Sequence, residues 1–307
     1  MELKQSTSRK KTPGISPELQ LARNYFKEKD NLLSPPITRA AYSDRMAWIL
    51  ASMAHLAYDK FEESGKPRRL LILKLKSGGF ELLKTFNSVE TDTQAFLAKS
   101  SDGYAVLAFR GTETAKRHDI VVDAAAMKVS VLEGRIHSGF RTAYASVARD
   151  IQKSVLELKD TPLYITGHSL GAALATIATQ SLEHHLRIRE MIAACYTFGS
   201  PRVGDRGYDR EFRSPIYRLV NTTDIVTVIP LLAMGYIHIG DIRYLGRLDG
   251  EFRRGIPVLQ RLYLFILTMF KFFGPVVGDH AIVEYRRKLE AIAQKRNRGF
   301  GRHLDHE

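Results

Sequence analysis

The chain contains one cysteine, Cys195, among its 307 residues. A single thiol can form neither an intrachain disulfide nor a cysteine-rich zinc site, so a disulfide-stabilised scaffold and a zinc ribbon are excluded. The N-terminal residues include basic side chains but no apolar stretch before Pro13, which argues against a secretory signal peptide. The cysteine count does not distinguish between compartments, but from the N-terminal segment we expect a cytoplasmic protein, with peripheral contact to a membrane as an option.

Long apolar runs are also lacking. The most apolar stretch extends from Leu262 to Phe270 between Arg261 and Lys271, whereas a membrane-spanning helix needs roughly 20 such residues. We therefore expect no transmembrane helix. The remaining composition, with 44% hydrophobic and 26% charged residues, excludes a collagen or a wholly disordered chain.

Changes in composition predict three parts. Residues 1–36 are polar, basic and interrupted by prolines, which indicates a flexible basic tail. Residues 37–295 are expected to form a single domain with an apolar insert at about 243–275, and residues 296–307 a C-terminal tail. Within the insert, residues 256–273 are rich in aromatic side chains. This segment is either a helix buried against the core or an apolar cap that lines the site or enters a lipid interface.

Strand-like and helical patterns alternate along the domain. Apolar runs predict strands at 70–75 and 80–86, joined as a hairpin by glycines, and further strands at 104–109, 162–166, 192–198 and 216–220. Helical spacing is seen around residues 40–58, 144–155 and from Leu170. A last helix places Ile282, Tyr285, Leu289 and Ile292 on one face and Arg286, Arg287 and Lys288 on the other. The alternation predicts an α/β protein with antiparallel strands at the start and a mostly parallel sheet covered on both faces.

One short motif points to chemistry. Residues 167–171 read Gly-His-Ser-Leu-Gly, which fits G-x-S-x-G, and they lie between a predicted strand and a small-residue helix. This strand-turn-helix setting is typical of a nucleophile elbow, in which Ser169 is presented on a tight turn. Since a serine hydroxyl is a weak nucleophile, the hypothesis requires an acid and a histidine later in the chain.

Several downstream residues could supply these groups. The acids are Asp205, Asp224, Asp241, Asp249 and Asp279, and only Asp224 comes just after a clear predicted strand. Of the histidines, His184, His185, His303 and His306 are expected at the surface. His238 and His280 remain, and His280 is favoured because His238 lies in an apolar alternating run, where a histidine is more often structural.

Further stretches resemble a known family, the class 3 or fungal-lipase-like lipases. The matching stretches, in family order, are Ala108–Thr112, His137–Phe140, Ile165–Ala175, Thr197–Asp205, Arg218–Asp224 and Asp279–His280 followed by Tyr285. The resemblance implies an α/β-hydrolase fold, with Ser169 as nucleophile, Asp224 as acid and His280 as base. It also implies an oxyanion hole formed by Thr112 and the backbone N–H of Leu170, and a lid at about 113–124, from which the usual tryptophan is missing.

The expected activity is hydrolysis of carboxylic esters, most specifically of acylglycerols, with no metal or cofactor. Phospholipase A1 activity or a general carboxylesterase is the alternative, and an inactive lipid- or nucleic-acid-binding module is a remote one. The net charge of +13 arises mainly in residues 1–14, 243–261 and 286–302, which carry +3, +3 and +6. Because these segments lie outside the matched motif stretches, the charge predicts attraction to anionic lipid surfaces and makes a nucleic-acid partner unlikely.

Overall fold

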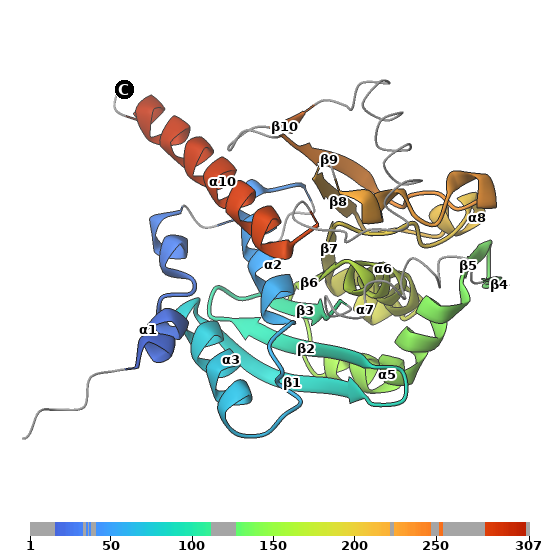
Figure 1. The fold of residues 1–307 in the computed structure, drawn as a ribbon, viewed down its shortest axis with the longest axis horizontal. Coiled ribbons are helices and arrows are strands. Elements are labelled where there is room, and N and C mark those ends of the chain that lie inside the picture. Colours follow the sequence, from blue (N-terminus) through green and yellow to red (C-terminus); the bar gives the residue numbers. More distant parts are fainter. Residues whose placement is uncertain are drawn as a thin grey trace, which may run out of the picture.

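The computed structural model describes residues 16–32, 35, 37, 41–111, 127–221, 224–246, 252–253 and 280–304. Within these residues the main sheet has eight strands in the order β1-β2-β3-β6-β7-β8-β9-β10 (Figure 1). The strands are β1 (Phe80–Ser88), β2 (Thr93–Ser100), β3 (Ala105–Phe109), β6 (Leu163–His168), β7 (Ile192–Phe198), β8 (Ile216–Asn221), β9 (Asp241–Leu245) and β10 (Phe252–Arg253). A separate antiparallel pair consists of β4 (Lys128–Ser130) and β5 (Arg135–His137).

The centre of the main sheet is parallel and its two ends are antiparallel. β1 pairs antiparallel with β2, and β2 with β3. From β3 through β6, β7 and β8 to β9 every pairing is parallel, and β10 closes the sheet antiparallel to β9. Because the carboxyl ends of the parallel strands share one edge of the sheet, the loops that follow β3, β6, β7 and β8 come together there.

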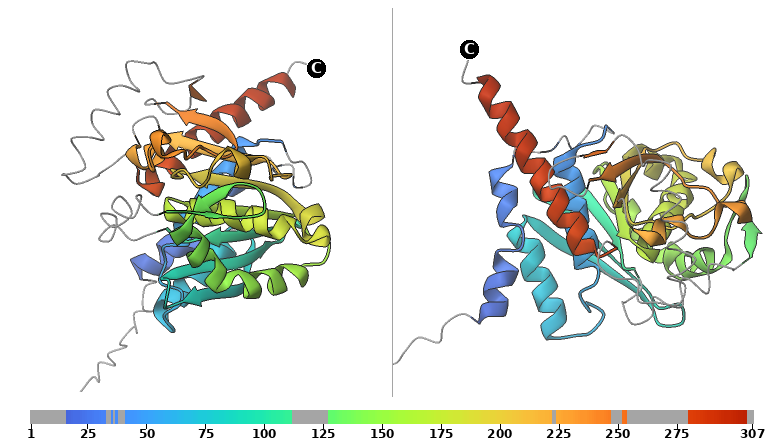
Figure 2. Two further views of the ribbon diagram at one scale, coloured as in Figure 1. Left: turned by 90° about the vertical axis from the view of Figure 1, so that its right-hand side faces the viewer. Right: turned by 45° about the horizontal axis from the view of Figure 1, so that its top comes forward.

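Helices cover both faces of the sheet (Figure 2). One side carries α2 (Asp44–Leu56), α3 (Lys66–Ser77) and α10 (Ile282–Leu304), and the other carries α5 (Ser138–Leu156) and α6 (Leu170–Glu183). The shorter helices are α1 (Pro17–Arg23), α7 (Leu186–Met191) and α8 (Arg206–Asp209), and 3-10 turns occur at Lys27–Asn31, Ile225–Val228 and Leu232–Met234. Each face of the sheet therefore has its own apolar core, as expected for a parallel sheet buried on both sides.

The strands predicted from 80 onward are confirmed as β1, β3, β6, β7 and β8, whereas β2 and β9 were not anticipated. The strand predicted at 70–75 is wrong, because this segment belongs to helix α3. Its two buried side chains, Leu71 and Leu75, are four residues apart, and Pro67 occupies the first turn. A spacing of four residues places both leucines on one face of a helix. The short apolar run at 70–75 is compatible with either a helix or a strand, so it could not by itself identify the helix.

The last helix was predicted with the correct apolar face but the wrong basic face. Ile282, Tyr285, Leu289 and Ile292 are all buried in α10, as expected. Lys288, however, is also buried, and its Nζ donates a hydrogen bond to Asn221 Oδ1 at 2.5 Å. Basic residues of α10 therefore belong in part to the interior.

Two expected features lie outside the described residues: the lid at 113–124 and the apolar segment 256–273. In the part of the chain that is described, each helix is either too short or too polar to cross a bilayer.

Candidate active site

Ser169 occupies a sharp turn between β6 and α6. Its backbone has φ 59° and ψ −128°, values that non-glycine residues adopt only under constraint. The flanking glycines explain how the turn closes. A Cβ on Gly167 would lie 2.1 Å from the Gly171 carbonyl oxygen, and one on Gly171 would lie 2.5 Å from the Phe109 carbonyl oxygen. The elbow geometry predicted for residues 167–171 is therefore present, and both glycines are sterically required.

His280 and Asp224 form a buried hydrogen-bonded pair. His280 Nδ1 lies 2.9 Å from Asp224 Oδ1 and 2.8 Å from Oδ2, and both residues are 2% exposed. A carboxylate accepts the bond, so Nδ1 carries the proton and Nε2 presents its lone pair. Neither His280 Nε2 nor Ser169 Oγ has a hydrogen-bond partner among the described residues. Two buried polar atoms of complementary character are thus left available for each other or for a ligand.

Contacts through neighbouring residues place this pair beside Ser169. The Ser169 N–H donates to the carbonyl oxygen of Phe198, the last residue of β7. The next residue, Gly199, has φ +57°, and a Cβ on it would lie 2.6 Å from Asp224 Oδ2 and 3.0 Å from His280 Nδ1. The structure therefore brings together Ser169, Asp224 and His280, which are 55 and 56 positions apart along the chain.

Tyr285 supports the acid from α10. Its hydroxyl donates to Asp224 Oδ2 at 2.6 Å and accepts from the Asn221 N–H at 2.9 Å, and the Val226 N–H donates to Asp224 Oδ1 at 2.9 Å. Burial raises the pKa of Tyr285 well above its usual value, and the negative charge of Asp224 raises it further. The phenol therefore stays protonated and remains a donor to the carboxylate.

His168 connects the elbow to the histidine. Its Nε2–H donates to the His280 carbonyl oxygen at 2.6 Å, and its Nδ1 lies 2.7 Å from the Tyr58 hydroxyl. The rings of His168 and His280 are 4.5 Å apart. The roles of Tyr58, His168 and Tyr285 were not predicted from the sequence. The one available signal was the position of Tyr285, a polar-tipped residue on the apolar face of the helix that follows His280.

The predicted oxyanion residues are described only in part. Leu170 is the first residue of α6, where backbone N–H groups lack partners within the helix. Thr112 lies outside the described residues. Its neighbour Gly111 is packed against the elbow, since a Cβ there would lie 2.5 Å from the His168 carbonyl oxygen and 3.2 Å from Ser169 Cβ. The end of β3 is therefore next to the serine.

Arg110 holds the end of β3 in place. Its guanidinium donates to both carboxylate oxygens of Glu62 at 2.6 Å and, through Nε, to the Ala57 carbonyl oxygen at 2.6 Å. Partial burial raises the pKa of Glu62, but the hydrogen bonds from Arg110, a backbone hydrogen bond and the charges of Arg110 and Lys60 together lower that pKa below its usual value. A bidentate pair of this kind fixes both position and orientation.

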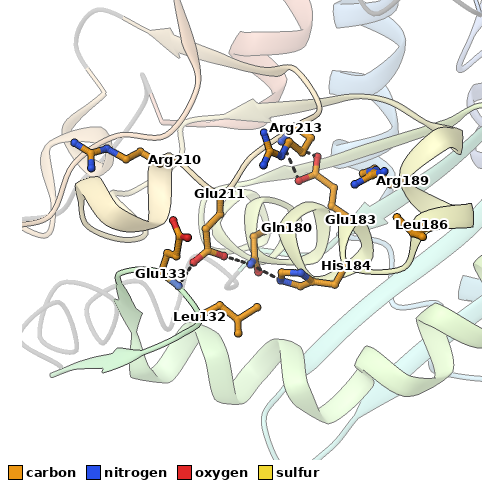
Figure 3. A pocket seen from close by; sticks show the side chains of 10 residues that line it. All are labelled: Leu132, Glu133, Gln180, Glu183, His184, Leu186, Arg189, Arg210, Glu211 and Arg213. Carbon is orange, nitrogen blue, oxygen red and sulfur yellow. Dashed lines mark hydrogen bonds between the residues drawn. The ribbon is translucent and has the colours of Figure 1, made fainter.

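A cavity of about 290 Å³ lies at the opposite end of α6 (Figure 3). A helix of this length separates it from Ser169 by roughly 20 Å. Its carboxylates have structural partners: Glu183 accepts from the backbone N–H groups of Arg213 and Ser214, and Glu211 accepts from Gln180 and the Glu133 N–H. These hydrogen bonds hold residues 211–214 against the end of α6. The cavity is separate from the serine site. Within the described residues, no three His, Cys, Asp or Glu side chains are arranged to hold a metal ion.

The chain is similar to known lipases. Residues 106–234 match the model of the family described as Lipase (class 3). A lipase from Rhizomucor miehei is 31% identical over 173 residues, which cover 52% of this chain and 47% of that protein. The secreted mono- and diacylglycerol lipase A of Penicillium cyclopium is 32% identical over 163 residues, covering 50% of this chain and 52% of the relative. The chain thus spans about half the length of the curated relatives that it matches.

A solved structure extends the likeness of the fold. The lipase from Rhizopus microsporus var. chinensis superposes with a TM-score of 0.58 at 22% identity, covering 89% of this chain and 87% of that one. The fold is accordingly that of an α/β hydrolase, as the resemblance implied.

The expected cytoplasmic location is contradicted by these comparisons, because a matched relative is named as a secreted lipase. The expectation rested on the N-terminal segment, which lies outside residues 106–234, the region that matches the family model.

Gly199→Ala tests whether the backbone at Gly199 must lie close to the side chains of Asp224 and His280. The added Cβ would displace Asp224 or His280, and a displacement of about 1 Å is expected to reduce kcat on a soluble ester about 100-fold. Gly103→Ala is the matched control, because Gly103 also has positive φ (+91°) but the nearest atom to its Cβ would be 3.7 Å away. Equal activity in the two folded variants would contradict the steric argument.

Tyr285→Phe tests the hydrogen bond to the acid. Removing a donor to a buried carboxylate is expected to lower the free energy of unfolding by about 1.5–3 kcal/mol, measured by urea denaturation. Tyr208→Phe serves as control, since Tyr208 is equally buried but its hydroxyl has no partner among the described residues. If the free energy of unfolding fell equally in both variants, the hydrogen bond from Tyr285 to Asp224 would make no specific contribution to stability.

Proposed function

From the premise that residues 106–234 of this chain belong to the class 3 lipase family, we propose that the protein is a serine hydrolase of carboxylic esters, acting on acylglycerols. The observation that carries the proposal is the buried His280–Asp224 pair beside Ser169, with Ser169 Oγ and His280 Nε2 both lacking partners among the described residues. The names of the matched relatives, lipase and mono- and diacylglycerol lipase, support the acylglycerol class. Residues 37–295 act as one catalytic domain in this proposal.

In the proposed reaction, His280 Nε2 removes the proton from Ser169 Oγ as the serine attacks the ester carbonyl carbon. Asp224 accepts from Nδ1–H, which fixes the tautomer of His280 and stabilises the imidazolium that forms. The tetrahedral intermediate collapses when the imidazolium gives its proton to the departing alcohol. Water then attacks the acyl-enzyme, with His280 again acting as base, and releases the carboxylic acid.

The oxyanion of each intermediate is assigned to the N–H of Leu170 and to Thr112. Loss of one such donor typically raises the barrier by about 2.7–4 kcal/mol. The position of Gly111 against Ser169 supports this assignment, since Thr112 is the next residue in the chain. The clamp between Arg110 and Glu62 then serves to keep that strand end in register with the elbow.

Ser169→Ala tests the proposal directly. We expect kcat on p-nitrophenyl esters to fall by about 10⁶-fold, as is typical when a serine nucleophile is removed from a triad, and labelling by a fluorophosphonate probe to disappear. Ser154→Ala, at a buried serine on α5, is the control and is expected to retain both activities. Full activity of the Ser169 variant would remove this residue from the mechanism.

Phospholipase A1 activity is the second candidate, because a basic chain suits anionic head groups. The described part of α10 weakens it: Lys288 is buried, Arg296 pairs with Asp44 and Arg287 pairs with Glu284. Lys288 is therefore withdrawn from any lipid surface, whereas the side chains of Arg296 and Arg287 remain 62% and 50% exposed and are only partly neutralised by their partners.

A substrate panel with vesicle binding separates the two candidates. Higher kcat/KM on acylglycerols than on diacyl phospholipids of equal chain length is expected for the first, and the reverse for the second. If the protein contacts an anionic surface, its binding to vesicles is expected to increase with anionic lipid content and to decrease with salt. Each basic residue in contact is expected to contribute about 1 kcal/mol to the binding free energy. Binding that responds to neither variable would reject the surface contact.

A further inference from the structure

The sheet face that carries α6 contains buried polar groups that the ester chemistry does not use. Thr197 on β7 and Arg218 on β8 are adjacent across the two strands. Their chain neighbours Tyr196, Phe198 and Leu219 lie in the core on the opposite face, so strand alternation directs Thr197 and Arg218 to the same side. Thr197 is 1% exposed and Arg218 5%. A guanidinium therefore lies in the interior of the protein.

These groups lack hydrogen-bond partners in the described part of the chain. The atoms concerned are Arg218 Nε and Nη1 and Thr197 Oγ1, together with Nε of Arg202. Arg202 is anchored to the same region through Nη1, which donates to the carbonyl oxygens of Val228 and Pro230. Buried N–H groups almost always have a partner, and each exception calls for one to be identified.

The local charge is positive. Burial lowers the pKa of Arg218 to about 10, with Arg202 adding to the effect, so Arg218 remains charged at neutral pH. Burial, then the charges of Arg218 and Arg202, lower the pKa of the neighbouring His238 well below its usual value. Asp224 raises the pKa of Arg218, so it is one negative charge beside the two guanidinium groups of Arg218 and Arg202. Its carboxylate oxygens accept from His280, Tyr285 and the Val226 N–H, and Nε and Nη1 of Arg218 are left without an acceptor among the described residues. Tyr244 and Tyr285 also act on Arg218, and burial raises the pKa of Tyr285 well above its usual value.

The strand beside Arg218 supplies no countercharge. Its partner across β8 and β9 is Ile242. One carboxylate beside two guanidinium groups leaves a net positive charge among the described residues, and a buried charge without full compensation destabilises a fold. Water could satisfy the N–H groups but not the charge.

We propose that Arg218, Arg202 and Thr197 form a binding site for a small inorganic anion of halide size. The donors are two guanidinium groups and one hydroxyl, which suit an anion that has no directional lone pairs. The near-complete burial of Thr197 and Arg218 excludes a bulky ligand such as a lipid head group. The anion acts as a structural ligand that neutralises Arg218 beneath the loop carrying Asp224.

The test is thermal and urea unfolding of the whole chain in sodium gluconate, with sodium chloride substituted stepwise at constant ionic strength. For the wild-type protein we expect a saturable rise in midpoint, and at a chloride concentration 100 times Kd the unfolding equilibrium constant falls about 100-fold. Thr197→Val, which removes one donor, is expected to raise the chloride concentration needed for half the effect about 10-fold.

Two variants distinguish a site at Arg218 from a general salt effect. Arg218→Met removes the charge, and Ile242→Glu supplies an internal carboxylate across the strands, so both are expected to lose the chloride dependence. Arg141→Met, at an exposed position of α5, makes the same change in net charge as Arg218→Met and is expected to keep it. Equal midpoints of the wild-type protein in the two salts, or a chloride effect that survives in Arg218→Met, would overturn the proposal.

Discussion

Two hydrogen-bond contacts from His280 Nδ1 to the carboxylate of Asp224 join the start of α10 to the loop after β8, in a region excluded from water. The contact orients the imidazole and leaves Nε2 available to Ser169 Oγ. It also requires that its surroundings supply further donors, because a buried carboxylate with unfilled lone pairs is costly. Tyr285 and the Val226 N–H meet that requirement, which is why the site extends well beyond three residues.

Close backbone approach is the second condition for this arrangement. Ser169 adopts a strained backbone conformation, and Gly167, Gly171 and Gly199 allow neighbouring segments to approach to distances that a side chain would block. The strain is tolerated because β6 and α6 are packed on both sides by the core. Rigid packing around a strained turn is typical of sites that hold a reactive group in one orientation.

Charge plays a different part from the one the composition suggested. The net charge of +13 directs attention to external anionic partners, yet several of these cations are used inside the molecule. Arg110 pairs with Glu62, Lys288 donates to Asn221, and Arg286 stacks on Tyr25. Nε and Nη1 of Arg218 are buried with no hydrogen-bond partner among the described residues, and the anion site proposed there follows from this difference.

Elements with a strong periodicity and residues with a local sequence signature could be predicted from the amino-acid sequence. The parallel strands β3, β6, β7 and β8, the apolar faces of α5 and α10, and the elbow at Ser169 follow from spacing and turn chemistry, which depend on neighbouring residues. Asp224 could be selected because it follows a predicted strand, and His280 because it precedes a predicted helix.

The tertiary structure was needed to identify contacts between segments that are distant in the sequence. It placed Tyr285 on Asp224, buried Lys288, and left polar atoms of Thr197, Arg202 and Arg218 buried without a hydrogen-bond partner among the described residues. Partner identity in these cases depends on which segments pack across the sheet, and a linear pattern of residue types contains no record of that packing.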